Sequence, residues 1–350
     1  MKMKKIATFP ISCVTALLLF AGTATAEARS WRVNSDATKH AHFADINAAM
    51  SSSEVLDGDT LYLDPGCNIT TQQNVTKKVT IVGTGYFLNT TAHQQACISA
   101  PVVMKSAGAK LEGLVIGHGN RLTISADYIT VERCSIWDVF WNGTGRYVSF
   151  RQCYVTGRIV GNGISNTTSI NCTIENCIIY YDWTSASFSA ISDMMSAVVR
   201  NNYVKVINTN STNIINNMGN GTIVNNIFVQ PRDRNKIFGT LTECVVRKNV
   251  MSCDENTYAT YPENKSIGTN DESAVFALEG TNDQLYTLKE GSPAIGAATD
   301  GGDCGPTGGL YPYVPSGFPF GMPHFQSSSI STRPQSGKVS VSQQVIIQNQ

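Results

Sequence analysis

Charge is scarce in this sequence. Asp, Glu, Lys and Arg make up 15% of the residues, and 26 basic side chains balance 26 acidic ones, so the formal net charge is zero. A protein whose main partner is a nucleic acid normally carries a basic patch and an excess of positive charge. The composition therefore argues against nucleic acid as the main partner.

A membrane-spanning apolar run is also lacking. The apolar run near the N-terminus, which includes Val14–Phe20, is shorter than the ~20 residues that a transmembrane helix needs. It follows the basic start Met1–Lys5 and precedes Ala24–Ala26, an order typical of a secretory signal peptide. We predict a signal peptide over residues 1–26, no transmembrane span, and a secreted, periplasmic or cell-surface protein. Loss of three lysines with that peptide changes the net charge from 0 to −3.

One six-residue phrase recurs through the middle of the chain. Counted from its central Cys or Asn, position −3 is always apolar, position −1 polar and position +2 apolar. Successive centres lie 19, 24, 25, 24 and 23 residues apart, which is the period of a solenoid. The copies are Val131–Ile136, Phe150–Val155, Ile174–Ile179, Val199–Val204, Ile223–Phe228 and Val246–Met251.

The pattern within each phrase predicts two strands joined by a sharp bend. Apolar residues at −3, 0 and +2 break the two-residue alternation of a single strand. We expect the bend at the Cys or Asn itself, because Asn tolerates left-handed backbone angles. Coils of equal length stack in parallel about 4.8 Å apart, so equivalent residues form columns. The expected column is Cys134, Cys153, Cys177, Asn202, Asn226 and Asn249.

These phrases resemble the Asn-ladder bend of the pectate-lyase-like superfamily. The resemblance implies an all-β protein, a single-stranded right-handed parallel β-helix, and extends loosely to the earlier coils Asp59–Gly66, Val79–Gly83 and Leu111–Val115. Before them, Trp31–Asp36 is expected to be a short strand. The segment His42–Met50 has Phe43, Ile46 and Met50 on one helical face and is expected to cap the open end of the solenoid.

The C-terminal part has a different composition. Leu285–Gly296 and Asp300–Gly309 resemble the closing segment of secreted β-helix proteins of Bacteroidetes, and the Pro-rich stretch from Pro312 to Pro323 is expected to lie along the last coils. A Ser-rich tail follows, mobile up to Lys338 and alternating like an edge strand from Val339. The predicted organisation is a signal peptide (1–26), one β-helix domain with its cap and closing segment (27–325), and the tail (326–350).

Ten cysteines are present, and nine remain after removal of Cys13. An odd number leaves at least one free thiol or one intermolecular bridge. Side chains stacked in register lie slightly too far apart for a relaxed disulfide, so we interpret the column cysteines as buried thiols. Three coils separate Cys172 from Cys244, so these two are not expected to pair.

Candidate ligand-binding residues follow the column by three to eight positions, where they are expected to share one face. Aromatic rings stack on sugar rings, and Arg pairs with the carboxylates of uronic acids. The face is therefore expected to bind an extended acidic polysaccharide. Its candidate binding residues are His118, Trp137, Trp141, Tyr181, Trp183, Arg232 and Arg234.

Within that face, Asp138, Arg158 and Asp182 fall on three consecutive coils and are the candidate catalytic residues. An arginine between two carboxylates suits β-elimination from a uronate. Two carboxylates two coils apart, about 9–10 Å by strand spacing, suit inverting hydrolysis. The alternative is an ion-pair ladder that binds nothing.

Family motifs decide little between these alternatives. Gly117–Gly119 matches the Gly-His-Gly of polygalacturonase-like hydrolases, but the acidic elements that precede it in that family are missing. Pectate lyases bind Ca²⁺ through clustered carboxylates, and no such motif occurs here, so no cofactor is predicted. The functional expectation is a monomeric lyase or hydrolase of acidic polysaccharide; the alternative is a non-catalytic glycan-binding or cell-surface β-helix protein.

Overall fold

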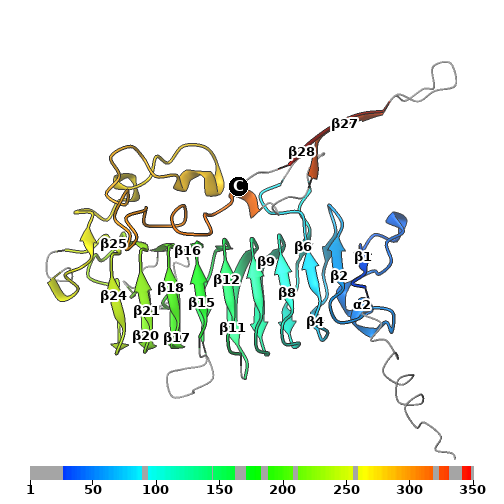
Figure 1. The fold of residues 1–350 in the computed structure, drawn as a ribbon, viewed down its shortest axis with the longest axis horizontal. Coiled ribbons are helices and arrows are strands. Elements are labelled where there is room, and N and C mark those ends of the chain that lie inside the picture. Colours follow the sequence, from blue (N-terminus) through cyan, green and yellow to red (C-terminus); the bar gives the residue numbers. More distant parts are fainter. Residues whose placement is uncertain are drawn as a thin grey trace, which may run out of the picture.

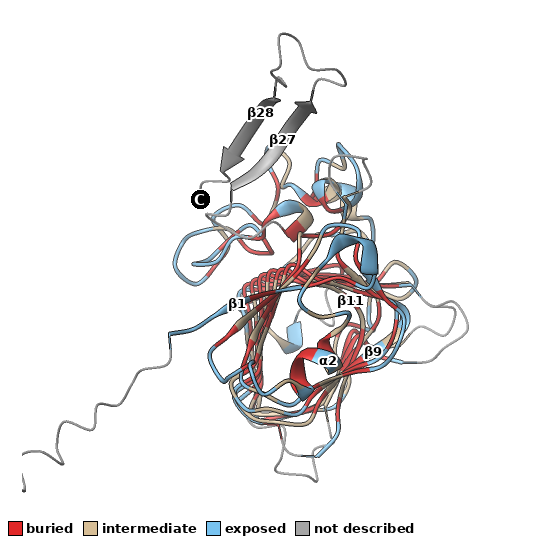
Figure 2. Ribbon diagram, turned by 90° about the vertical axis from the view of Figure 1, so that its right-hand side faces the viewer, coloured by how far each residue is buried: buried red, intermediate tan, exposed pale blue. Residues whose placement is uncertain are grey.

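A computed structural model describes residues 27–88, 94–143, 145–161, 171–182, 188–207, 212–254 and 259–317, and the backbone of 323–330 and 341–347. The chain folds as a right-handed parallel β-helix whose coils stack along one long axis (Figure 1). Two parallel sheets form its walls, as the view along the axis shows (Figure 2). This confirms the predicted fold class.

The first sheet contains the strand that opens each coil. Its ten strands, in spatial order, are β1 (Ser30–Val33), β2 (Thr60–Leu63), β5 (Thr80–Val82), β8 (Lys110–Glu112), β10 (Thr130–Glu132), β12 (Ser149–Arg151), β15 (Thr173–Glu175), β18 (Val198–Arg200), β21 (Thr222–Val224) and β24 (Val245–Arg247).

The second sheet contains the strands that follow the sharp bend. They are β3 (Asn68–Ile69), β4 (Gln73–Val75), β6 (Cys97–Ile98), β7 (Val102–Met104), β9 (Val115–Ile124), β11 (Ser135–Trp141), β13 (Tyr154–Val155), β14 (Ile159–Val160), β16 (Ile178–Asp182), β17 (Ile191–Met195), β19 (Tyr203–Ile207), β20 (Ile215–Gly219), β22 (Ile227–Val229), β23 (Leu241–Thr242), β25 (Val250–Met251) and β26 (Lys265–Ser266).

The register of both sheets follows the repeated phrase. Each apolar residue at position −3 pairs with its equivalent in the next coil, from Val131 to Val246. The residues at position +2 pair in the same way, from Ile136 to Met251. Both sets point into the interior and are buried, except that Val246 of the last coil is partly buried, because every coil turns the same side chains inward.

The column at the bend is confirmed. The side-chain amide of Asn202 donates to Asn226 Oδ1 over 2.9 Å, and Asn226 donates to Asn249 over the same distance. Asn264 extends the ladder by one coil. At the other end, the Cys177 amide donates to Asn202 Oδ1 (2.8 Å). All nine cysteines in the described residues are free, and the three in the column are buried.

The bend itself lies one residue earlier than predicted. The left-handed residues are those at position −1, among them Arg133, Gln152, Asn176, Asn201 and Asn225, with φ between 49° and 59°. The column residue points inward and uses its amide for the ladder. The preceding residue therefore absorbs the change of chain direction.

A second column of left-handed residues lies at the turn before the first sheet, two positions before each strand. Half of its members are Gly or Asn, such as Gly108 and Asn171, which tolerate this conformation, but two adjacent coils use Tyr128 (φ 59°) and Tyr147 (φ 56°). Holding a bulky side chain in this region costs about 1–3 kcal/mol for each residue. Stacking of the two aromatic rings contributes about 0.5–1.5 kcal/mol of stabilisation. The column consists of Gly58, Gly108, Tyr128, Tyr147, Asn171, Ser196, Asn220 and Glu243.

A short helix caps the N-terminal end of the solenoid, as predicted. Helix α2 (Ile46–Ser51) starts after the N-cap Asp45, and its Ile46 and Met50 side chains join the interior core. Figure 2 shows α2 lying across the open end of the coils. Phe43 precedes the helix, forms a bridge with Val33 and packs against the same core. A 3₁₀ turn, η1 (Ala37–Lys39), lies between β1 and the cap.

The closing segment, residues 265–317, contains the 3₁₀ turns η2 (Glu272–Ala274), η3 (Asn282–Tyr286) and η4 (Pro315–Gly317). It starts at the last coil and runs back along the bend edge (Figure 1). Gly305 N donates to Asn225 O (2.8 Å), Asn176 Nδ2 donates to Gly308 O (2.6 Å), and Tyr86 N donates to Ser316 O (2.7 Å).

The expected position of the Pro-rich stretch was therefore wrong. Pro312 lies beside Gln152 of the middle coils, and Tyr313 lies beside Tyr86 of the early coils. The segment buries a second apolar cluster against the outside of the solenoid, with Tyr203 packed on Phe276 and Tyr286. Within the tail, β27 (Pro323–Ile330) pairs with β28 (Val341–Ile347) in an antiparallel two-stranded sheet; β27 thus occupies part of the stretch that was expected to be mobile.

Candidate functional site

Asp138 and Arg158 come together on the second sheet. Asp138 lies in β11, and its Oδ1 accepts the backbone N–H of Arg158 over 2.7 Å. The guanidinium lies 3.5 Å from Asp138 Oδ2. Gly157 makes this approach possible, since a Cβ atom there would lie 2.2 Å from the carbonyl oxygen of Trp137. The Asp138 side chain is completely buried, so the expectation of a carboxylate facing a polysaccharide was wrong.

Asp182 does not join this pair. It is the last residue of β16 and is exposed. Among the residues that the structure describes, no ion pair links Asp182 to Arg158. The expected alignment of three catalytic side chains therefore reduces to one buried pair and one separate surface carboxylate.

Two predicted aromatic platforms are buried instead. Trp141 is 6% exposed; its Nε1 donates to Gly145 O (3.0 Å), and its ring packs edge-on against Phe150 in the core. Tyr181 is 1% exposed. Burial raises the pKa of Tyr181, an effect that the positive charge of Arg158 partly opposes. Neither ring presents a face on which a sugar stacks. Trp183 lies outside the described residues.

His118 and Trp137 lie together on the outside. Strand β9 has three more residues than β11 between the paired positions Ile116–Ile136 and Arg121–Asp138. The extra residues project His118, which is exposed. Its ring centroid lies 5.1 Å from that of Trp137 at an interplanar angle of 45°. The Gly-His-Gly segment thus forms a bulge that places an imidazole beside an indole.

Next to this pair, two arginines and two phenylalanines alternate across four coils. The guanidinium carbon of Arg121 lies 4.5 Å from the ring centroid of Phe140, and that of Arg158 lies 5.1 Å from the same ring. Arg158 also lies 4.2 Å from the ring centroid of Phe188. Phe188 is 51% exposed, and Arg121 is exposed as well. We call Arg121, Phe140, Arg158 and Phe188 the Arg–Phe column.

The two remaining candidate arginines belong to another part of the solenoid. They lie in the turn after β22, where Arg232 is exposed and Arg234 donates to Cys253 O over 3.1 Å. This turn bonds to the coil of β20, since Ile214 N donates to Lys236 O. Within the described residues, no hydrogen bond or ion pair joins the turn to Asp138 or Arg158.

The closing segment covers part of the predicted ligand face. Lys205 Nζ forms an ion pair with Glu272 of that segment at 2.8 Å and lies 5.3 Å from the ring centroid of Tyr180. Tyr203 also donates to Glu272. Side chains that directly follow the bend, such as Tyr203 and Lys205, are therefore used for packing against the closing segment.

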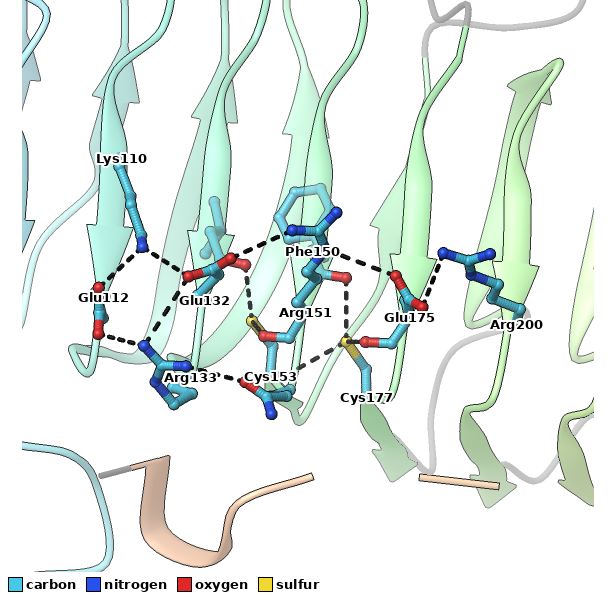
Figure 3. Close-up of polar contacts among 12 residues, drawn as sticks. Lys110, Glu112, Glu132, Arg133, Phe150, Arg151, Cys153, Glu175, Cys177 and Arg200 are labelled. Carbon is cyan, nitrogen blue, oxygen red and sulfur yellow. Dashed lines mark hydrogen bonds and ion pairs between the residues drawn. The ribbon is translucent and has the colours of Figure 1, made fainter. Parts of the chain in front are cut away.

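A charged row that the sequence interpretation missed crosses the first sheet (Figure 3). Glu132 pairs with Lys110 (2.6 Å) and Arg151 (3.5 Å), and Glu175 pairs with Arg151 (3.5 Å) and Arg200 (2.9 Å). The signal was present at position −2 of the repeated phrase, which reads Glu, Arg, Glu, Arg in successive coils. Because each carboxylate faces a cation, the row joins coils and leaves no free acid or base.

Glu112 and Arg133 complete this row. Arg133 donates to Glu112, and Lys110 lies 3.0 Å from the other Glu112 oxygen. Burial opposes ionisation of Glu112, but the charges of Arg133 and Lys110 outweigh it and hold the pKa of Glu112 below its usual value.

No group of three or more His, Cys, Asp and Glu side chains in the described residues is arranged to hold a metal ion. The same residues contain no helix with the length and apolarity needed to cross a membrane.

Comparison with known proteins identifies no family. No protein-family model matches the chain, and no curated protein sequence matches it. Among solved structures, the chain is similar to the crystal structure of pectate lyase Pel9A, with a TM-score of 0.39 and 12% sequence identity over 79% of this chain and 96% of that chain. This similarity is too low to carry an activity across.

Proposed function

We propose that this protein is exported and binds an acidic polysaccharide on the surface formed by the Arg–Phe column with His118 and Trp137. The observation that carries the proposal is the alternation of Arg121, Phe140, Arg158 and Phe188 across four successive coils. The rings hold the guanidinium groups in a fixed orientation. Arg158 is only 11% exposed and is already paired with Asp138, so the exposed Arg121 is the group suited to pair with a carboxylate of the ligand. Spacing by coils suits an extended, repeating ligand.

The geometry supports binding more than turnover. A general base has to reach the proton that it removes, whereas the carboxylate beside Arg158 is completely buried. Asp182 is exposed, and in the described part of the chain it forms no ion pair with Arg158. Rings and guanidinium groups without an accessible carboxylate at their centre are features of a recognition surface. The proposal therefore favours a glycan-binding protein over a lyase or a hydrolase.

The test is a binding series with the mature chain. Polygalacturonate, alginate and a neutral glucan are titrated calorimetrically into the wild type and into an Arg121→Ala, Phe188→Ala double variant. We expect the double variant to bind polyuronate about tenfold more weakly, because cation–π and charge-assisted contacts are each worth roughly 1 kcal/mol. Arg247→Ala is the matched control, since it removes an exposed arginine from β24, and its affinity should equal that of the wild type.

Two readouts of the same incubations separate binding from catalysis. Unsaturated product absorbs near 235 nm, and new reducing ends report hydrolysis. Binding without either signal supports the proposal. Turnover that depends on Arg158 would replace it with an enzymatic function, and equal affinity of wild type and double variant would move the ligand to another surface.

A further inference from the structure

Tyr128 and Tyr147 form an exposed aromatic pair outside the surface described above. They lie at the turns that lead into β10 and β12, at the ends of these strands far from the bend and its closing segment. Their rings are parallel within 6°, with centroids 5.0 Å apart. Tyr128 is 57% exposed and Tyr147 is 50% exposed. Two large rings are thus held rigidly at the surface.

Tyrosine does not favour the left-handed backbone conformation that these two positions adopt. Both residues are left-handed; four other coils fill the same position with Gly or Asn, and two with Ser196 and Glu243. Gly has no Cβ to clash, and Asn bonds locally through its amide, whereas the Tyr side chain offers neither advantage. Strain of this kind tends to be kept where the side chain has a function. Its occurrence in two adjacent coils points to the ring pair itself as the selected feature.

The coil before Tyr128 leaves room beside its ring. The equivalent residue there is Gly108, whose amide donates to Asp127 O over 3.1 Å, so the two turns are direct neighbours. No side chain projects from Gly108 beside Tyr128. Lys78 extends across it, with Cε 2.9 Å from the place that a Cβ of residue 108 would take. Lys78 is exposed, and its side chain lies over the turn that neighbours Tyr128.

A cation next to an open aromatic face fits an anionic sugar. The hydrogen atoms of a pyranose face pack on an aromatic ring, while the ammonium group pairs with a carboxylate on the ring edge. We propose that Tyr128, Tyr147 and Lys78 form a second subsite that binds one uronate residue of the polysaccharide. The proposal rests on the proposed function for the class of ligand. It adds a separate contact on another edge of the solenoid, so long chains gain avidity that short oligomers lack.

The experiment compares chain lengths in a variant that relieves the backbone. Tyr128→Asn and Tyr147→Asn are combined, because Asn occupies the same column at Asn171 and Asn220. Long polygalacturonate should bind the double variant at least fivefold more weakly than the wild type, whereas a galacturonate tetramer should bind both equally. The melting temperature should be unchanged or higher, since strain is removed along with the rings.

A purely structural role predicts the opposite pattern, with a lower melting temperature and unchanged affinity for the long chain, and that result overturns the inference. Lys78→Gln should weaken the binding of long polygalacturonate at least twofold and leave the binding of a neutral glucan unchanged. An equal loss of affinity for both ligands also counts against the subsite. Tyr311→Asn is the control, because it removes an exposed tyrosine of the closing segment, and it should bind like the wild type.

The two proposals fail in different ways. If the Arg121→Ala, Phe188→Ala variant binds more weakly and the tyrosine double variant binds like the wild type, the subsite is overturned and the proposed function stands. If the tyrosine double variant binds more weakly and the Arg121→Ala, Phe188→Ala variant binds like the wild type, the surface of the proposed function is overturned and the subsite stands. A wild-type chain that binds no polyuronate of any length overturns both.

Discussion

Asp138 illustrates how burial determines the role of a single side chain. Its carboxylate has no exposed surface and is held by the backbone N–H and guanidinium of Arg158. A buried carboxylate of this kind is costly to desolvate, and breaking its pair leaves an uncompensated charge. Its contribution is therefore to the structure, where it fixes Arg158 between Phe140 and Phe188.

Replacing Asp138 should accordingly destabilise the fold. We expect Asp138→Ala to lower the free energy of unfolding by about 3–5 kcal/mol, because Arg158 loses its partner inside the protein. Asp138→Asn keeps an acceptor for the Arg158 N–H and should cost less. Urea unfolding followed by circular dichroism measures both.

Asp182→Ala provides the comparison at an exposed carboxylate and should stay within about 0.5 kcal/mol of the wild type. An Asp138→Ala protein as stable as the wild type would show that the pair contributes nothing to the fold.

At the scale of elements, the closing segment is what makes the outside of the second sheet part of a core. Tyr86, Tyr313 and Asp283 form a buried hydrogen-bonded chain between an early coil and this segment, in which Tyr313 donates to Asp283 over 2.9 Å. Burial raises the pKa of Asp283, although hydrogen bonds from Ser316 and Tyr313 oppose that shift. The chain anchors the far end of the segment.

Removing one hydroxyl tests this anchor. Tyr313→Phe leaves Tyr86 without its buried partner, and we expect a loss of about 1–3 kcal/mol in the free energy of unfolding. The amide of Tyr86, bonded to Ser316 O, should exchange its hydrogen faster. Tyr311→Phe serves as control because Tyr311 is exposed. Unchanged exchange at Tyr86 would place the anchor elsewhere along the segment.

At the scale of the whole molecule, stability is distributed along the axis. The Asn ladder crosses the C-terminal coils, and the charged row crosses the central ones from Lys110 to Arg200 (Figure 3). Within the solenoid, each coil packs only against the neighbouring coils, so such rows couple coils that would otherwise unfold separately.

The charged row makes stability depend on acid. The pKa of Glu112 is lower in the folded protein than in the unfolded chain, where it is about 4.3. Its contribution is therefore fully present above that value and is lost as the pH falls through the lower, folded pKa. Glu112→Gln should lower the melting temperature at pH 7 and reduce its further fall between pH 5 and pH 3.

Thermal unfolding at a series of pH values measures this effect. Glu279→Gln, at an exposed position of the closing segment, should follow the wild-type curve. A Glu112→Gln curve parallel to that of the wild type down to pH 3 would contradict the assignment.

How far the sequence predicted the structure depends on whether a feature repeats. Val131, Phe150 and Ile174 lie in register as expected, since one coil after another must bury the same positions. The ladder at Asn202 and Asn226 follows from the same repeat. The bend at position −1 was placed one residue too late, because periodicity fixes the spacing of coils but not which residue takes the left-handed angle.

The candidate site was predicted less well, because its geometry is set by departures from the repeat. Three additional residues in β9 carry His118 outward to Trp137. Trp141 and Tyr181 turn inward although their sequence offsets resemble those of exposed neighbours. Loop lengths and local bulges differ from coil to coil here, so an equal offset no longer means an equal direction.

The sequence by itself determined the solenoid, the stacking of its coils and the cap at its N-terminal end, since each depends on apolar periodicity within or between neighbouring coils. Only the tertiary structure decided which polar side chains remain accessible. The closing segment returns over distant coils and covers Lys205 while leaving Arg121 and Phe188 exposed. Such contacts between residues far apart in the chain depend on the three-dimensional path of the segment, which no local pattern encodes.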